Sequence, residues 1–239
     1  MGPEPRIDYK WVALSNTTLG VLLATIDASI VLIAMPDIFR GIHLDPLQPG
    51  NSFYLLWMIL GFLVVSSVLV VSLGRLGDQF GRVRMYNLGF VVYTLASLLL
   101  TIDWMHGRAG ADYLIAFRIV QGIGAAFLIA NSVAILTDAF PANQRGLALG
   151  INNVVGISGM FIGLVLGGLL APISWRLIFL VSVPFGLAGT IWSYRSLREI
   201  GKLCSRRSRR TSWPSTMRSS LAARVRSPGA TAVVAIQVA

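Results

Sequence analysis

Long apolar segments alternate with short polar connectors along the first 194 residues of the chain. A helix needs about 20 predominantly apolar residues to cross the hydrocarbon core of a bilayer, and six segments approach or exceed that length. We expect Pro36, Pro141 and Pro172 to close the first, fourth and fifth of them. The pattern predicts spanning helices over about residues 12–34, 53–73, 85–100, 113–136, 147–170 and 177–194.

Composition points to the same fold class. Hydrophobic residues make up 55% and charged residues 13% of the 239 residues, and that charged fraction is about half of what a soluble domain carries. Because lipid supplies no hydrogen-bond partners, a segment that crosses it satisfies its backbone internally as a helix. The first apolar segment lacks the short hydrophobic region and cleavage site of a signal peptide. We therefore predict an all-α, multi-pass membrane protein.

Basic residues in the connectors indicate the orientation. With a cytoplasmic amino terminus, the internal segments before residue 195 hold six basic residues and the external connectors hold three. Short cytoplasmic loops carry the excess of Lys and Arg, so we predict that both termini are cytoplasmic, in the plasma or inner membrane of the cell. The internal residues are Arg6, Lys10, Arg75, Arg82, Arg84 and Arg145, and the external ones are Arg40, Arg108 and Arg176.

A strongly basic tail follows the sixth segment. Ten of the 20 basic residues lie at or after Arg195, and only Glu199 opposes them. We divide the chain into a cytoplasmic segment (1–11), a six-helix transmembrane bundle (12–194) and a basic cytoplasmic tail (195–239) that we predict to be disordered. The favoured interpretation of the run beyond about residue 201 is a shifted reading frame. The alternatives are an anchor on anionic lipid and a nucleic-acid-binding tail, although RNA-binding motifs and aromatic platforms are missing.

Two charged residues fall inside the predicted spans. A charge in hydrocarbon costs about 2.5–3.5 kcal/mol on insertion scales and normally faces a cavity or a partner. Asp27 is therefore a candidate proton carrier, the alternative being a residue that reaches the outer interface. Arg118 shares a helical face with Gln121 and needs a carboxylate, a water-lined cavity or backbone carbonyls around it. The sequence leaves open whether Asp27 and Arg118 pair directly.

The connector over residues 74–84 is rich in glycine and charge, with three glycines, three arginines and one aspartate. Glycines permit a tight turn, and Asp78 and Arg82 would share one face if this stretch is helical. Asp138, at the cytoplasmic end of the fourth span, could join them in a three-charge cluster. The alternative is a solvated turn that obeys the positive-inside rule, which would leave the glycine spacing unexplained.

The fifth span carries a stripe of glycines. Gly159, Gly163 and Gly167 repeat every four residues, and such a stripe of small residues lets another helix approach closely. Gly156 and Gly168 complete the set. Plain helix packing is the alternative to a functional motif.

Four motifs, in the correct order over about residues 10–200, resemble those of the major facilitator superfamily of transporters. The segment around Arg118 is similar to the family's fourth-helix motif. Asp27 followed by Pro36 resembles the first-helix motif of the fourteen-helix drug:proton antiporter branch. The glycine-rich fifth span and the charged connector are the other two, and the connector positions that match directly are Gly74, Asp78, Gly81 and Arg82.

The resemblance implies one six-helix half-bundle of the superfamily fold. It also implies proton coupling through Asp27 and Arg118, with Gln121 beside them, and an inner latch of the connector charges with Asp138 that breaks as the transporter turns inward. One departure is Gln79, which stands where relatives often have a basic residue. Another is Leu164, which stands where the antiporter motif has a proline. Antiport is nevertheless favoured over symport.

Other chemistries find little support in the sequence. No nucleophile–base constellation or phosphate-binding loop is recognisable, so we expect no enzyme. His43 and His106 lie in separate connectors, where we expect them to be far apart, and no metal site is predicted. The single cysteine, Cys204, cannot form an internal disulfide. We expect no cofactor, with a proton gradient as the driving force.

The predicted function is proton-coupled efflux of drugs or other small molecules by what we expect to be a truncated half of a longer transporter. The expected partners are the lipid bilayer, a small-molecule substrate such as a hydrophobic drug, and a missing second half or a second copy. Nucleic acid is not expected. The alternatives are an inactive truncated product and a membrane-anchored binding protein that acts through the basic tail. The fold does not select the substrate.

Overall fold

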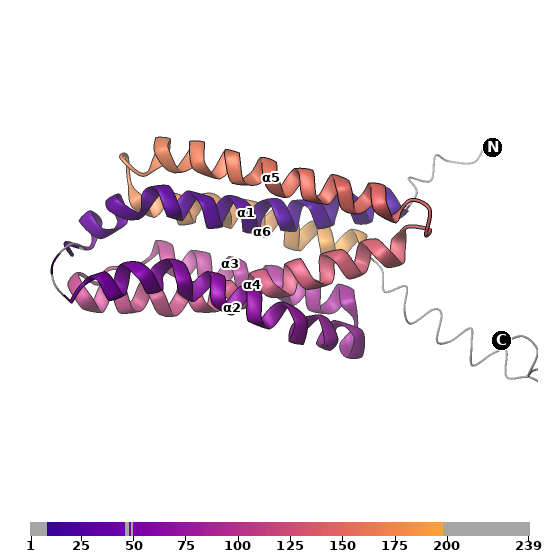
Figure 1. Ribbon diagram of the computed structural model, residues 1–239, viewed down its shortest axis with the longest axis horizontal. Helices are drawn as coiled ribbons and strands as arrows, with labels where there is room; N and C mark the ends of the chain where they lie inside the picture. Colours follow the sequence, from indigo (N-terminus) through magenta and orange to yellow (C-terminus); the bar gives the residue numbers. More distant parts are fainter. Residues whose placement is uncertain (1–8, 46–47, 49, 198–239) are drawn as a thin grey trace, which may run out of the picture. The chain divides into compact units, whose positions relative to one another are not determined.

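The structure is a computed structural model that describes residues 9–45, 48 and 50–197 (Figure 1). Each of its six α-helices is long and apolar enough to cross a membrane. The predicted all-α membrane fold is therefore confirmed for the described part of the chain. The predictions for Cys204 and for the basic tail beyond residue 197 lie outside the described residues. The helices are α1 Tyr9–Gly41, α2 Ser52–Phe80, α3 Arg82–Thr101, α4 Gly107–Ala139, α5 Arg145–Leu170 and α6 Trp175–Ser196.

Helices α1, α3 and α4 are more enclosed by their neighbours than the other helices are. Helix α1 packs along α5 and also contacts α6 and α4, while α4 packs along α2 and α3. Contacts between α3 and α6 complete the bundle, in which α1, α5 and α6 group together beside α2, α3 and α4 (Figure 1). A side chain in the middle of α1 or α4 can therefore be enclosed by helices on several sides.

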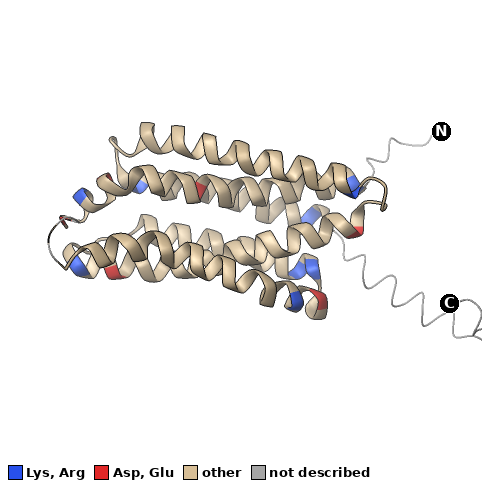
Figure 2. Ribbon diagram, in the orientation of Figure 1, with Lys and Arg blue, Asp and Glu red and all other residues tan. Residues whose placement is uncertain are grey.

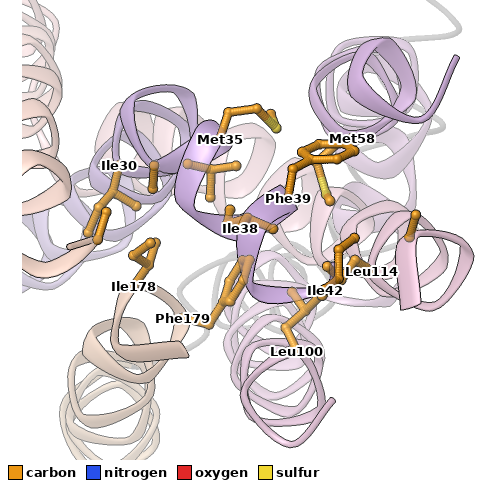
Figure 3. Packing of buried hydrophobic residues seen from close by; sticks show 14 of the residues in the cluster. Ile30, Met35, Ile38, Phe39, Ile42, Met58, Leu100, Leu114, Ile178 and Phe179 are labelled. Atoms are coloured by element: carbon orange, nitrogen blue, oxygen red, sulfur yellow. The ribbon is translucent and has the colours of Figure 1, made fainter. Parts of the chain in front are cut away.

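Apolar side chains close one end of the bundle, where α1 and α3 finish and where α2, α4 and α6 begin. We call this group the apolar end cluster (Figure 3). Lipid tails are as apolar as these side chains, so close packing rather than escape from water holds the helices together. The members that are fully or almost fully buried and labelled in the figure are Ile30, Met35, Ile38, Phe39, Ile42, Met58, Leu100, Leu114, Ile178 and Phe179.

The first helix extends further than the sequence indicates. Helix α1 continues through Pro36 and ends only at Gly41, so the expectation that Pro36 closes it is wrong. Proline removes one backbone donor and normally kinks or ends a soluble helix. In a spanning helix the neighbouring helices and polar side chains can satisfy the freed carbonyl, and proline is tolerated there.

The connector over residues 74–84 is almost entirely helical. Helix α2 continues to Phe80 and α3 begins at Arg82, so Gly81 is the only residue between them. Gly81 has φ 110° and its backbone N–H donates to Gly77 O at 2.9 Å. A backbone with this positive φ favours glycine over any residue with a side chain. The sequence predicted a turn somewhere in these eleven residues, and in the structure a single residue, Gly81, makes it.

Candidate functional site

A buried ion pair lies in the middle of the bundle, whereas most charged residues lie near helix ends (Figure 2). Arg118 Nη1 of α4 donates to Asp27 Oδ2 of α1 at 2.5 Å, and the two side chains are 2% and 0% exposed. The sequence left this pairing open, and the structure makes it. Because an unpaired charge at this depth is costly, each residue provides the neutralising partner that the other needs.

Gln121 connects both charges to the surrounding helices. Its Oε1 accepts a hydrogen bond from Arg118 Nη1 at 2.6 Å, and its Nε2 donates to Asp27 Oδ1 at 3.1 Å. The same Nε2 donates to Ser97 Oγ of α3 at 2.8 Å. Ser182 Oγ of α6 lies 3.5 Å from Asp27 Oδ1. Four helices therefore hold this group of residues, which we call the buried polar network.

Two aromatic residues border the buried polar network. The Arg118 guanidinium carbon lies 4.3 Å from the centroid of the Phe62 ring, a cation–π distance. The Tyr93 hydroxyl is buried and close enough to interact electrostatically with Asp27 and Arg118. Among the described residues it has no hydrogen-bond partner. Arg118 Nε is likewise buried without a hydrogen-bond partner among these residues.

The sequence identified the two charges and Gln121 but missed four residues of this site. These are Phe62, Tyr93, Ser97 and Ser182. Serine and aromatic residues are common throughout apolar helices, so their type alone does not single them out. One usable signal was the α3 register, since Tyr93 and Ser97 are four residues apart and therefore share a face.

The arrangement at this site is a carboxyl group beside a fixed positive charge. When ionised, Asp27 pairs with Arg118; when protonated, it can donate or accept hydrogen bonds but no longer neutralises the guanidinium. A buried pair of this kind contributes little to net stability and makes its two members strongly dependent on each other. The proton-coupling roles of Asp27, Arg118 and Gln121 remain predictions.

The three charged side chains of the predicted cluster come together at the end of the bundle opposite the apolar end cluster. Arg82 Nη2 lies 2.8 Å from Asp78 Oδ1, and its Nη1 lies 2.6 Å from Asp138 Oδ2. Arg82 Nη1 also donates to Ala134 O at 3.1 Å. One guanidinium thus ties the ends of α2, α3 and α4. Whether this cluster acts as a latch during transport remains a prediction.

The two predicted glycines of the connector differ in their surroundings. Gly81 adopts the positive φ described above. A Cβ on Gly74 would lie 3.7 Å from Ala130 Cβ, an ordinary contact. A tighter position is Gly77, which the sequence did not single out, because a Cβ there would lie 2.0 Å from Asn131 Oδ1. Gly81 is therefore the glycine that this geometry requires, whereas a side chain on Gly77 would displace the end of the Asn131 side chain.

The glycine stripe of α5 faces α1. A Cβ on Gly163 would lie 2.5 Å from Ile26 O, and one on Gly167 would lie 2.9 Å from Ile30 O. Gly159 is equally close to Thr25, whereas Gly156 meets only ordinary contacts. Gly168 meets nothing within 4 Å among the described residues, so the structure does not include it in this packing face.

His43 and His106 lie next to each other, which corrects the expectation that they are far apart. Their ring centroids are 5.2 Å apart and the planes are tilted by 47°. The sequence gave no signal for this contact because the two connectors meet only in the folded bundle. No group of three or more His, Cys, Asp and Glu side chains that could hold a metal ion occurs within the described residues.

Asp103 lies in the same connector as His106. Burial raises the pKa of the Asp103 carboxyl group, and the Met105 backbone N–H and the charges of Arg176 and His106 act in the opposite direction. Met105 N donates to Asp103 Oδ1 at 2.8 Å, and Arg176 Nη2 donates to the Asp103 backbone oxygen at 2.7 Å. These contacts fix the connector between α3 and α4 against the start of α6.

Comparison with known proteins assigns this fold to a family of multi-pass membrane proteins. The family described as Major Facilitator Superfamily matches residues 17–236, and the chain belongs to this family. A solved bacterial homologue of the human lysosomal transporter Spinster, inward-facing and unoccupied, matches with a TM-score of 0.66. The two sequences are 19% identical, and the match covers 83% of this chain and 44% of the solved chain. The likeness therefore concerns the fold alone.

Two curated relatives carry names that describe what they transport or resist. The riboflavin transporter RibZ of Clostridioides difficile is 35% identical over 180 residues, which are 74% of this chain and 37% of that protein. The methylenomycin A resistance protein of Bacillus subtilis is 32% identical over 193 residues, 79% of this chain and 38% of that protein. The chain therefore spans less than half the length of the curated relatives it matches.

Proposed function

We propose that this chain forms the amino-terminal half-bundle of a proton-coupled transporter that exports drugs or other small organic molecules. The observation that supports it most directly is the buried pair of Asp27 and Arg118, bridged by Gln121. Family membership supplies transport as the general activity. A protonatable carboxylate within this pair supplies a way to couple transport to protons.

Protonation and ion pairing are alternative states of Asp27. A proton on the carboxyl group removes the negative charge that faces Arg118. The guanidinium then keeps Gln121 Oε1 and the Phe62 ring, which offset part of the cost of losing its counter-charge. A substrate that prefers one of the two states shifts the site toward that state, and the proton is thereby bound or released. Coupling requires only this difference in affinity.

The second half of the transport machinery is part of the same proposal. Alternating access in this type of transporter involves two halves that rock around a site near the middle of the membrane. The described bundle provides one half, and its partner would be a separate six-helix half or a second copy of the chain. We place the bundle in the plasma membrane with the cluster of Arg82, Asp78 and Asp138 on the cytoplasmic side.

The proposed substrates are organic molecules of the kind named for the relatives. Those names specify riboflavin in one case and the antibiotic methylenomycin A in another. The buried polar network offers such a molecule one unpaired hydroxyl, that of Tyr93, beside the ion pair. A mostly apolar organic molecule with a few polar or charged groups fits such surroundings better than an inorganic ion or a sugar.

Transport in proteoliposomes tests the proposal. The purified chain is reconstituted so that a second copy can supply the other half, a pH gradient is imposed, and movement of the fluorescent cation ethidium is followed. We expect gradient-driven transport by the wild type and loss of the gradient dependence in Asp27→Asn, which keeps the shape but not the charge.

The matched control is Asp37→Asn on the same helix. Asp37 pairs with Arg40 at an exposed position near the end of α1, 2.9 Å away, and this variant should behave as the wild type. Undiminished gradient-driven transport by Asp27→Asn would contradict the proposal. Transport by the wild type that ignores the gradient would contradict proton coupling while leaving transport itself intact.

A further inference from the structure

The two histidines of the chain meet at the end of the bundle that carries the apolar end cluster. They are the only histidines in the 239 residues. His43 follows α1 and His106 immediately precedes α4, and both side chains are exposed. Their rings lie in contact, with centroids 5.2 Å apart. With the orientation predicted from the basic residues, this end faces the outside of the cell.

The backbone holds the two histidines in place. Gly107 N donates to Ile42 O at 2.6 Å, so the residues next to each histidine are bonded to each other. His43 has φ 57° and Gly107 has φ 65°, both in the left-handed region. Ile42 is fully buried in the apolar end cluster (Figure 3). The ring contact therefore rests on a fixed base rather than on two freely moving loops.

The ring separation of 5.2 Å leaves room for two imidazoles to share one metal ion. Zinc binds imidazole nitrogen at about 2.0–2.1 Å and prefers tetrahedral geometry, which puts the centroids of two ligating rings about 5 Å apart. Imidazole suits zinc, copper and nickel, whereas calcium and magnesium prefer oxygen ligands. The chemistry of the pair therefore selects for transition-metal dications.

A nearby carboxylate adds negative charge to this surface. Asp103 is three residues before His106 and interacts electrostatically with it. Its Oδ2 is buried and has no hydrogen-bond partner among the described residues. Carboxylates close to metal-binding histidines commonly orient the ring and strengthen the site. The positive charge of Arg176 partly cancels the negative charge of Asp103. The two imidazoles would therefore contribute most of the metal affinity.

We propose that His43 and His106 bind one transition-metal dication, such as zinc or nickel, with water completing the coordination. The ion links the end of α1 to the start of α4. These are the helices that carry Asp27 and Arg118, so a bound ion restrains the two elements that hold the buried ion pair. The binding site itself depends on neither transport nor proton coupling.

Calorimetric titration of the full chain with Ni²⁺ tests the site. The protein is purified with a tag that contains no histidine, so that these two are the only imidazoles present. We expect one saturable ion per chain, and about tenfold or greater weakening in both His43→Gln and His106→Gln because one ligand is lost. Mg²⁺ titrated in the same way should give no saturable binding.

Two further variants separate ligation from ring packing and from general surface charge. His106→Phe keeps an aromatic ring against His43 but removes the nitrogen ligand, so it should fold as the wild type and lose Ni²⁺ affinity. Asp112→Asn removes an exposed carboxylate from the first turns of α4 and should leave the affinity unchanged. Wild-type Ni²⁺ affinity in His106→Phe, or no saturable binding by the wild type, would overturn the proposal.

Discussion

Gln121 joins both charges of the buried polar network to the rest of the bundle. It accepts from Arg118 and donates to Asp27 and Ser97. An amide is suited to this position because it offers both a donor and an acceptor without adding charge. Its neighbours are buried, so they have no access to water if the amide is removed.

Truncation of this amide should destabilise the protein. Buried polar groups left without a partner cost about 1–3 kcal/mol, so Gln121→Ala should unfold at a lower temperature than the wild type in detergent, followed by tryptophan fluorescence. Gln79→Ala, at an exposed position near the end of α2, serves as the control and should change little. A Gln121→Ala protein with the unfolding temperature of the wild type would show that the bridge is dispensable.

Among individual residues of the site, the charged ones could be predicted from the sequence and most of the neutral ones could not. Asp27 and Arg118 were identified because a charge in hydrocarbon is rare and costly. Ser182 and Phe62 carry no such cost, and their proximity to the charges follows only from the three-dimensional packing of α6 and α2. The contact of His43 with His106 was missed for the same reason.

Helices α1 and α5 approach closely enough that glycine is required at their contact. The Ile26 carbonyl faces Gly163 at a distance that excludes a Cβ. The backbone carbonyl cannot rotate away as the end of a side chain can, so a methyl group must separate the two helices. Gly168, one turn further and on another face, has open space around it in the described part of the chain.

These two glycines give a matched pair of variants. Gly163→Ala should lower the unfolding temperature, since overpacking in a well-packed interface costs about 1–3 kcal/mol. Gly168→Ala adds the same methyl group to the same helix without a clash and should be neutral or slightly stabilising. Equal unfolding temperatures for the two variants would contradict a close contact between α1 and α5.

The sequence predicted the six helices correctly but shortened most of them. Hydropathy detects the part of a helix that lies in lipid, whereas α1 and α4 run on to Gly41 and Ala139 with polar residues in their last turns. The charged connector was misread because three glycines indicated a turn, although only Gly81 leaves the helical region. Helix ends depend on capping and tertiary contacts that a hydropathy pattern does not contain.

For the whole bundle, we expect the cluster around Arg82 to matter more for motion than for stability. Its three side chains are 31%, 58% and 42% exposed, and ion pairs so exposed contribute at most about 1 kcal/mol each. Arg82→Gln should therefore slow ethidium transport in proteoliposomes with little change in unfolding temperature. Arg75 is an exposed arginine of the same segment. The control Arg75→Gln should change neither the rate of ethidium transport nor the unfolding temperature. A large loss of stability in Arg82→Gln would assign the cluster a structural role instead.

Helices α2 and α5 differ from the rest of the bundle in how little of them is covered. In the most apolar 18-residue stretch of each of these helices, only 22% of the residues are buried within the described part of the chain. The corresponding share is 56% for α1 and 61% for α4. Lipid can cover such faces, and so can the second half that the proposed transport cycle requires.

The single residue between α2 and α3 limits how the bundle can deform. Consecutive Cα atoms are about 3.8 Å apart, so Gly81 alone leaves no slack, and an axial displacement of α2 must carry α3 with it. At the other end of the bundle, residues 42–51 separate α1 from α2, so no one-residue link joins those two helices. Helices α2 and α3 should therefore move as one unit at the end of the bundle that carries the Arg82 cluster.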